Sequence, residues 1–556
     1  MQRDIDRLST ETFDVLIVGS GIYGATMARQ CALQGLKVAL IEKDDFGGAT
    51  SANSLKIIHG GLRYLQSMDI KRMRQSISAR RRLLKIAENS VVPLPCVIAT
   101  SKRFMRSRLL MGVALMMNNI ISWDRNNGLA ENSRIPNSKL LSRNEYKNIV
   151  SGLADEVTGA AFWHDAMALN TERLTLDFIL SADTNGACVA NYVFAERYLL
   201  QKNRITGIAA RDSLSNKSFN ISAKQIIDAR GPWSGFIKPG LPNISNSGYP
   251  AWALSFNVIV KKQIFQDYAV GLSAGTCRSA KIDDELDEGR EFFFVPWRDC
   301  TIIGTAYRAY TGHPDESKPG HEDLTKFIQQ LNVLYPAAEL ELSDVVFVQH
   351  GLLPAEAGQG KPDVELLNQP LIIEHDKTGG PAGLTSVIGV KYTTALPVAD
   401  LLVKKITKKL GLKYKKIIAE PLLTEPATIE LEKSNQPQEE TMLSEEENGS
   451  IALLKQRFGI KYLEIISMIN EWPGLAEQLI SDPPVIAAEI IYSVRSEMAV
   501  SLSDVVFRRT GIGSAGHPGK ALLEKIADLL ARELSWSEEI KQQEINRVEE
   551  VYGHPR

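Results

Sequence analysis

The sequence predicts an α/β fold made of a parallel-sheet domain, an antiparallel sheet interleaved with it, and a helical domain at the C-terminus. Three observations lead to this prediction. Residues 13–45 alternate between an apolar strand, a glycine turn, a helix of small and apolar residues and a second strand. Residues 251–310 contain longer strand-like runs such as AWALSFNVIVKK and REFFFVPWRDCTIIGTAYRAY. From residue 451 to the end, helical periodicity dominates.

Length and composition divide the chain further. With 556 residues it is long enough for several domains and has ample apolar content for stable cores. The stretch around residues 420–450 is acidic and contains prolines, which is typical of an exposed linker. We therefore predict an interleaved domain at 1–420, an acidic linker at 421–450 and a helical domain at 451–556.

Charge and cysteine content exclude several classes of function. The 64 Lys and Arg residues and 66 Asp and Glu residues leave a formal net charge of −2, so we expect no nucleic-acid partner. The N-terminus is polar and has no apolar signal core, so we expect a cytoplasmic protein. The cysteines are odd in number and form no C-x-x-C pair, which argues against a disulfide framework and a metal site: Cys31, Cys96, Cys188, Cys277 and Cys300.

One apolar stretch, LLMGVALMMNNIISW at residues 109–123, leaves two interpretations open. It is shorter than the roughly 20 residues of a membrane-spanning helix, and Asn118 and Asn119 interrupt it. It also follows the basic sequence SKRFMRSR. The segment is either a helix packed on its own domain or a helix that lies on a membrane surface.

The βαβ pattern of residues 13–45 predicts a dinucleotide-binding unit. Gly19 permits a tight turn, Gly21 lets a pyrophosphate approach the backbone, and Gly24 lets the helix pack closely on the strand. The helix N-terminus then faces the phosphates. Glu42, at the end of the second strand, can accept hydrogen bonds from ribose hydroxyls and would repel a 2′-phosphate. We expect a Rossmann-type domain that does not bind NADP.

The continuation of the chain favours FAD over NAD. A loop of small and hydroxyl residues follows Glu42, and residues 223–235 and 384–406 look like two later returns to the first sheet. A cofactor site assembled from such distant segments is typical of large flavoproteins, and the helix start near Thr393 can stabilise negative charge on a reduced flavin. The predicted FAD-binding residues are Gly19, Gly21, Ile22, Tyr23, Gly24, Glu42, Lys43, Thr50, Ser51, Ser54, Val193, Gly231, Gly389, Lys391, Thr393 and Thr394.

The segment SLKIIHGGLRYLQS, residues 54–67, mixes features that need a ligand. Glycines 60 and 61 do not suit a surface helix, and a buried strand accepts His59 and Arg63 only where their polar groups find partners. The segment therefore predicts a ligand-binding site.

The chain resembles the FAD-dependent glycerol-3-phosphate dehydrogenase family, within the D-amino-acid-oxidase-like flavoproteins. The resemblance covers nearly the whole length and rests on DVLIVGSGIYGA, ATSANSLKIIHGGLRYLQ, DARGPW, FVPWRDCTIIGTAY, GVKYTTA and EIIYSVRSEMAVSLSDVVFRRTGIG. It implies an antiparallel-sheet substrate cap on the FAD-binding domain. It also implies a role in glycerol metabolism, the oxidation of glycerol 3-phosphate to dihydroxyacetone phosphate.

Within this resemblance, the segment that contains His59 passes beside the flavin and helps to build the substrate pocket. Oxidation of a secondary alcohol sends a hydride to the flavin and a proton to a base, for which His59 is the natural candidate. Arg63 can hold a phosphate, Tyr64 can orient a substrate oxygen, and Lys391 can polarise the alcohol or stabilise the reduced flavin. These four are the predicted catalytic residues.

The sequence departs from the family pattern at three positions. Leu353, Leu396 and Met167 stand where the family commonly has arginines, so a phosphate dianion would lose charge-assisted contacts. One alternative is therefore a flavoenzyme that acts on a less anionic hydroxy or amino compound. Another is a flavin-binding interaction protein without catalysis. Four residues could compensate for the lost cations: His350, His164, Arg308 and Arg298.

The expected electron acceptor follows from the lack of a second dinucleotide-binding pattern in the sequence. No other G-x-G-x-x-G follows a strand and opens a helix, so we expect electrons to pass to quinone or oxygen and not to a bound NAD. Quinone would give the segment 102–123 a purpose, as a peripheral contact on the inner face of the membrane. Assembly as a homodimer is left open.

Overall fold

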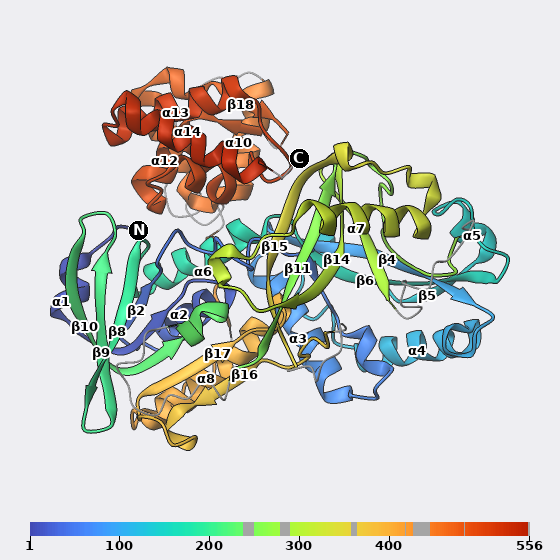
Figure 1. Cartoon of the computed structure of the whole chain (residues 1–556), viewed down its shortest axis with the longest axis horizontal. Helices are drawn as coiled ribbons and strands as arrows, with labels where there is room; N and C mark the ends of the chain where they lie inside the picture. Colours follow the sequence, from blue (N-terminus) through green and yellow to red (C-terminus); the bar gives the residue numbers. More distant parts are fainter. Residues whose placement is uncertain are drawn as a thin grey trace, which may run out of the picture.

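Figure 1 shows the computed structural model of the chain, with two sheets side by side and a C-terminal helical domain above them. The structure describes residues 1–236, 249–277, 290–356, 364–417, 419–425, 445–482 and 484–553. Across these ranges, no helix combines the length and the apolar character needed to span a bilayer.

The first sheet confirms the predicted parallel-sheet domain. Its strand order is β16-β17-β10-β1-β2-β7, and every neighbouring pair is parallel except β16 with β17. Both predicted returns to this sheet are present, since β10 pairs with β1 and β17 pairs with β10. The strands are β1 (Thr12–Val18), β2 (Val38–Ile41), β7 (Cys188–Ala190), β10 (Lys217–Asp228), β16 (Leu371–Glu374) and β17 (Leu384–Ile388).

An antiparallel meander extends this sheet on one side. It consists of β8 (Val193–Gln201) and β9 (Arg204–Asp212), which pair with each other and then with β10. A short helix, α1 (Ile5–Thr10), contacts the same region. The polar turns in this part of the sequence therefore separate strands, as their composition predicts.

Helices pack closely on the parallel sheet. Helix α2 (Ile22–Leu33) is almost wholly buried and contacts α6 (Thr171–Thr184) and α8 (Ala395–Lys409). A Cβ atom on Gly24 would lie 1.8 Å from the carbonyl oxygen of Gly19, so only glycine lets α2 start this close to β1. Small residues in α2 thus set the spacing of the layer that carries the glycine turn.

The second sheet is formed by strands from four separate parts of the chain. Its order is β15-β11-β14-β13-β12-β4-β6-β3, with β5 beside β6. Phe292 and Phe294 point into a core that also contains Phe327 of helix α7. The elements are β3 (Ile57–Ile58), β4 (Val91–Ser101), β5 (Lys139–Ser142), β6 (Val157–Ala168), β11 (Ala251–Val260), β12 (Ala269–Ser273), β13 (Glu291–Trp297), β14 (Cys300–Tyr310), β15 (Val345–Ala355), α3 (Ile70–Ile86), α4 (Arg108–Ile121), α5 (Arg143–Lys147) and α7 (His321–Leu334).

Helix α4 packs with one side on its own domain, where it contacts β5 and β6 and where Met111 and Met117 lie against hydrophobic cores. Leu115 is the one buried side chain among its residues, all of which are described. Leu109 on the helix is 81% exposed, and Trp123 just beyond it is 75% exposed. Helix α4 therefore leaves an apolar stripe exposed on the side opposite its packed side, and both interpretations of the segment stay open.

The C-terminal region is helical, as expected, with one small β-hairpin. Helix α10 starts at Glu445, inside the range predicted as linker, and residues 426–444 of that range lie outside the described residues. The division into three units thus stays a prediction. The elements are α10 (Glu445–Phe458), α11 (Tyr462–Glu471), β18 (Gln478–Ser481), β19 (Pro484–Ile486), α12 (Ala487–Glu497), the π-helix η13 (Asp504–Arg509), α13 (Lys520–Leu534) and α14 (Glu538–Tyr552).

Candidate active site

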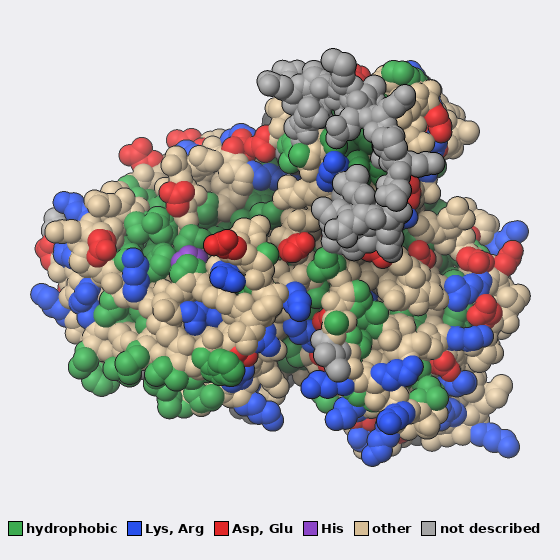
Figure 2. Space-filling model, turned by 180° about the vertical axis from the view of Figure 1, so that it is seen from behind, with side chains coloured by type: hydrophobic (Ala, Val, Ile, Leu, Met, Phe, Trp, Pro, Cys, Tyr) green, Lys and Arg blue, Asp and Glu red, His purple; other side chains and the backbone are tan. Residues whose placement is uncertain are grey.

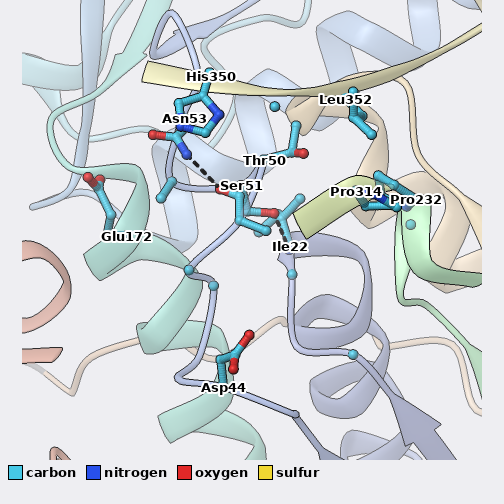
Figure 3. Close-up of a pocket in the computed structure, with 18 of the residues that line it drawn as sticks. Ile22, Asp44, Thr50, Ser51, Asn53, Glu172, Pro232, Pro314, His350 and Leu352 are labelled. Carbon is cyan, nitrogen blue, oxygen red and sulfur yellow. Dashed lines mark hydrogen bonds between the residues drawn. The ribbon is translucent and has the colours of Figure 1, made fainter. Parts of the chain in front are cut away.

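A cavity of about 1430 Å³ opens at the carboxyl ends of β1, β2 and β17. Figure 3 shows its wall, in which Ile22 and Ser51 from the first domain face His350 and Leu352 from strand β15. Residues of the C-terminal domain line it as well. The cavity therefore lies where all three parts of the molecule meet, and ligands of α/β proteins bind at such strand ends.

The glycine turn after β1 forms one end of the cavity. Gly19 has a φ of +97°, which favours glycine, and Gly21 is the residue that precedes helix α2. The backbone N–H of Ile22 donates to Ser51 Oγ at 2.9 Å, and a Cβ on Gly21 would lie 3.0 Å from the same oxygen (Figure 3). The turn thus presents bare backbone and a helix N-terminus to the cavity, as a pyrophosphate requires.

Glu42 holds this turn in place from the end of β2. Its carboxylate accepts hydrogen bonds from the Ser20 N–H at 2.8 Å and from the Ser20 hydroxyl at 3.1 Å. Burial raises the pKa of Glu42, against the lowering effect of these donors. The residue lines the cavity, where the carboxylate is also placed to meet a ribose hydroxyl.

Most of the predicted cofactor-binding residues line this one cavity. Gly24 instead packs beneath the turn. Thr394 lies behind the wall, with its hydroxyl 2.5 Å from that of Tyr23, whose pKa burial raises to about 12. The residues in the wall are Gly19, Gly21, Ile22, Tyr23, Glu42, Lys43, Thr50, Ser51, Ser54, Val193, Gly231, Gly389, Lys391 and Thr393.

The predicted base, His59, faces the cavity and is held by an aspartate from another strand. His59 Nδ1 lies 3.3 Å from Asp165 Oδ2 on β6, and the side chain of His59 is 47% exposed. Asp165 also accepts hydrogen bonds from the Gly60 N–H at 2.6 Å and from Arg80 Nη1 at 2.9 Å. Burial opposes ionisation, but the contacts with His59 and Arg80 lower the pKa of Asp165 to about 2. Asp165 is therefore a carboxylate at neutral pH.

The other three predicted catalytic residues differ in whether they reach the cavity. Lys391 lines the cavity, and its Nζ donates to the Tyr64 hydroxyl at 3.0 Å. The ammonium also lies 4.9 Å from the centre of the Tyr64 ring. Arg63, in the 3₁₀ turn η1 (Leu62–Leu65), is exposed and lies outside the cavity lining. The structure thus joins Tyr64 to Lys391 and places Arg63 on the surface.

The three positions at which the family commonly has arginines also lie in different parts of the structure. Leu353 on β15 lines the cavity. Leu396 is buried in the core between α8 and α2, and Met167 packs against the core of the second sheet. The expectation that all three face the pocket is therefore wrong for Leu396 and Met167. The reason is that their positions on α8 and β6 direct them into hydrophobic cores.

Of the four residues proposed to compensate, His350 lines the cavity. Arg308 instead forms an exposed ion pair with Asp323. Arg298 stacks on a tryptophan ring and donates to the Gly511 carbonyl. Burial, reinforced by Arg80, lowers the pKa of His164 to about 4, so this side chain is neutral at pH 7. These three residues lie away from the cavity wall.

Sequence reasoning missed two groups at the site. Nothing in the local sequence marks Asp165 as a site residue, because it lies on β6 and its partner His59 is 106 positions earlier in the chain. Lys56 and Glu172 form a buried ion pair in the cavity wall, with Nζ 3.3 Å from Oε2. Lys56 belongs to the unusual 54–67 segment, so its position beside His59 was the available signal.

The residues present fit FAD. The cavity is lined by residues from β1 to β15, including Gly21 just before α2 and Thr393 in the turn that leads into α8. Gly231 has a φ of +57° and open space where a Cβ would stand. Two helix N-termini suit a ligand with a pyrophosphate and a ring that gains negative charge.

Comparisons with known proteins agree with an FAD-dependent enzyme. The profile of FAD-dependent oxidoreductases matches residues 14–401, and that of the C-terminal domain of alpha-glycerophosphate oxidase matches residues 431–541. A glycerol-3-phosphate dehydrogenase of Synechocystis is 28% identical over 99% of this chain and 98% of its own length. The mitochondrial glycerol-3-phosphate dehydrogenase of mouse is 27% identical over 97% of this chain and 72% of its own.

Among solved structures, the glycerol-3-phosphate dehydrogenase of Bacillus halodurans, complexed with FAD, shares the fold. It superposes with a TM-score of 0.71 at 20% identity and covers 99% of this chain and 96% of its own. The profile match spans well over half of the chain and includes both sheets that form the cavity. This chain belongs to the family of FAD-dependent oxidoreductases.

Proposed function

We propose that this protein oxidises the secondary alcohol of glycerol 3-phosphate to the ketone of dihydroxyacetone phosphate and reduces its FAD. Similarity over the whole length to glycerol-3-phosphate dehydrogenases supports this activity. The observation that carries the proposal is that one cavity contains the glycine turn, His59 backed by Asp165, and Lys391.

FAD, when bound, supplies the hydride acceptor for the carbinol carbon. The side chains of the protein take the proton from the substrate hydroxyl and hold the substrate oxygen. Because His59 Nδ1 faces Asp165, its Nε2 is left for the substrate hydroxyl. The Asp165 carboxylate then stabilises the imidazolium that forms and fixes the ring orientation.

Lys391 supplies the positive charge in this arrangement. Its ammonium lines the cavity and is held by the Tyr64 hydroxyl at 3.0 Å. A cation here lowers the energy of negative charge that develops on the substrate oxygen as the proton leaves. Tyr64 is thus a positioning residue, and Lys391 contacts the substrate.

A second candidate substrate class is favoured by Leu353. This side chain lines the cavity where the related enzymes commonly have an arginine, so the wall offers no guanidinium at that point. A less anionic hydroxy or amino compound would suit such a wall. This candidate keeps the cofactor, His59 and Lys391, and changes only the group that the substrate presents to β15.

Anaerobic flavin reduction tests both candidates. The purified holoprotein is mixed with glycerol 3-phosphate, glycerol, and a panel of hydroxy and amino acids, while flavin absorbance is followed. Rapid bleaching at low glycerol 3-phosphate concentration supports the main proposal. Bleaching only by uncharged or amino compounds supports the second. A flavin that no compound reduces would identify a flavin-binding interaction protein.

We further propose that helix α4 attaches the protein to an anionic bilayer, where membrane quinone accepts the electrons. Figure 2 shows an apolar patch at the lower edge of the molecule with Lys and Arg side chains nearby. Basic side chains next to an apolar helix face favour the surface of an anionic membrane over a protein partner. The exposed apolar residues are Phe104, Leu109, Val113, Met116, Ile120 and Trp123, and the nearby basic residues include Lys102, Arg103 and Arg106.

Vesicle binding tests the attachment. The holoprotein should sediment with vesicles that contain phosphatidylglycerol, and Leu109→Ser with Trp123→Ser should abolish this binding. Ile540→Ser is the matched control, because Ile540 is 43% exposed on α14 of the C-terminal domain and does not line the cavity. Equal sedimentation of all three proteins would contradict the proposal and leave oxygen as the acceptor to be examined.

A further inference from the structure

We propose that the C-terminal helical domain is part of the cofactor site, and that Arg508 donates a hydrogen bond to the phosphates of bound FAD. Residues of this domain form part of the cavity wall. Six of its residues near helix η13 line the same cavity as the glycine turn: Val500, Ser501, Ser503, Phe507, Arg508 and Ser514.

Asp45 connects the two domains directly behind that wall. It lies in the loop after β2 and its side chain is 1% exposed. Its carboxylate accepts hydrogen bonds from Arg509 Nη1 at 2.7 Å and Nη2 at 2.8 Å, and from Arg508 Nε. Asn191 Nδ2 adds another at 3.0 Å. The loop that follows the second strand is thus held chiefly by side chains from the far end of the chain.

The electrostatics of this contact favour a permanently ionised pair. Burial opposes ionisation of Asp45, but the charges and hydrogen bonds of Arg509 and Arg508 hold its pKa well below the usual range. Removal of one partner from such a buried pair leaves an uncompensated charge. Docking of the C-terminal domain therefore fixes the loop in one position at neutral pH.

The position of Arg508 places its guanidinium beside the phosphate-binding turn. Its stem packs on Gly48, since a Cβ there would lie 3.7 Å from Arg508 Cδ and 3.9 Å from Nη1. The neighbouring Gly47 N–H donates to Ser20 Oγ at 3.4 Å, and Ser20 lies between the two glycines of the turn. Arg508 is therefore one loop away from the start of α2.

The hydrogen bonds of Arg508 leave one donor group for a ligand. Nε donates to Asp45, and Nη2 donates to Asp504 Oδ1 at 2.6 Å. Within the described part of the chain, Nη1 has no hydrogen-bond partner, and the side chain lines the cavity. A guanidinium oriented by two carboxylates, with a free N–H facing a phosphate site, is well suited to pair with a phosphate oxygen.

This arrangement links cofactor affinity to domain docking. If Arg508 contacts both Asp45 and the phosphates, then FAD stabilises the docked C-terminal domain, and docking tightens FAD binding by the same factor. The C-terminal domain then acts as the third side of the cofactor site, in addition to the glycine turn and the Ser51 loop.

Dilution of the holoprotein tests the proposal without reference to activity. Free FAD is more fluorescent than bound FAD, so a dilution series gives the dissociation constant. We expect Arg508→Gln to raise this constant about tenfold or more, because a charge-assisted contact is lost, and Arg508→Lys to raise it less. Arg495→Gln is the control, since Arg495 pairs with Glu533 on the exposed side of the same domain.

A second readout separates cofactor binding from folding. Tryptophan fluorescence during heating gives the unfolding midpoint, and excess FAD should raise it less in Arg508→Gln than in the parent. If Arg508→Gln does not fold, Arg508→Lys carries the test, because the ammonium can still pair with Asp45. A folded variant of either kind with the dissociation constant and the FAD-induced shift of the parent would overturn the proposal.

Discussion

The two ends of the cavity are built in different ways. The glycine turn of the proposed phosphate end, with Gly19, Gly21, Ile22 and Ser51, comes from one continuous stretch of about 33 residues (19 to 51), to which Arg508 is the proposed addition. The proposed substrate end, defined by His59 with its partner Asp165, Lys391 and Leu353, comes from four distant segments. Local backbone geometry can create a phosphate site, whereas proton transfer needs side chains whose relative positions are set by tertiary contacts.

The difference has a chemical reason. A pyrophosphate is bound by backbone N–H groups and a helix dipole, which any sequence with the right glycines supplies. A substrate hydroxyl needs a base and a cation at defined positions, and each must be oriented by a further partner. Asp165 for His59 and Tyr64 for Lys391 are those partners here. Four changes test this contrast, from the largest expected effect to the smallest.

At the phosphate end, Gly21→Val should abolish FAD binding. A Cβ on Gly21 would lie 3.0 Å from Ser51 Oγ, and the two methyl groups beyond it would occupy the space of the pyrophosphate. The measurement is the FAD content of the purified protein. Gly474→Ala is the control, because the nearest atom to its Cβ lies at 3.5 Å. Parental FAD content in Gly21→Val would show that the phosphates bind elsewhere.

At the substrate end, His59→Gln should retain FAD and lose flavin reduction. The loss of a positioned base typically lowers the rate by about 10² to 10⁴-fold. Asp165→Asn should also lower the rate, because His59 remains but loses the carboxylate that orients it and stabilises its charged form. Stopped-flow bleaching of the flavin gives both rates. A parental rate in His59→Gln would remove His59 from the mechanism.

Leu353→Arg should improve the use of glycerol 3-phosphate. Leu353 lines the cavity, and a guanidinium there could add a contact of up to about 3 kcal/mol, equivalent to roughly a hundredfold in affinity. The comparison is the concentration dependence of flavin reduction in parent and variant, with Leu401→Arg on the exposed side of α8 as the control.

Two outcomes of this comparison are informative. Tight and rapid use of glycerol 3-phosphate by the parent would show that Lys391 and its neighbours suffice for the phosphate. Weak use by the parent without a gain in Leu353→Arg would favour a different substrate and exclude Leu353 as the cause.

The smallest effect concerns stability. The pKa of Asp165 is lowered from 3.8 to about 2 in the folded protein, so its ionised form contributes about 2 kcal/mol of stability. This contribution is complete above the unfolded pKa and is lost as the pH falls through the folded one. We therefore expect Asp165→Asn to lower the urea midpoint equally at pH 8 and pH 5. A destabilisation that disappears at pH 5 would contradict the assignment.

The fold and the phosphate end could largely be predicted from the sequence. Apolar runs of period two and helical stripes identify strands and helices locally, and the glycines of residues 19–24 determine a backbone shape with little help from the rest of the chain. The two returns to the first sheet were also visible, because residues 223–235 show a strand that runs into a glycine turn and residues 384–406 show a strand, a turn and a helix.

Only the tertiary structure decided which side chains face the cavity. Arg63 and His59 are four residues apart, yet the 3₁₀ turn after Gly61 directs one to the surface and leaves the other at the cavity. Leu353 and Leu396 looked equivalent as missing cations, but one lies on a strand at the wall and the other in a helix core. Asp165 and Arg508 reach the site from β6 and the C-terminal domain, because side-chain direction depends on how distant elements pack.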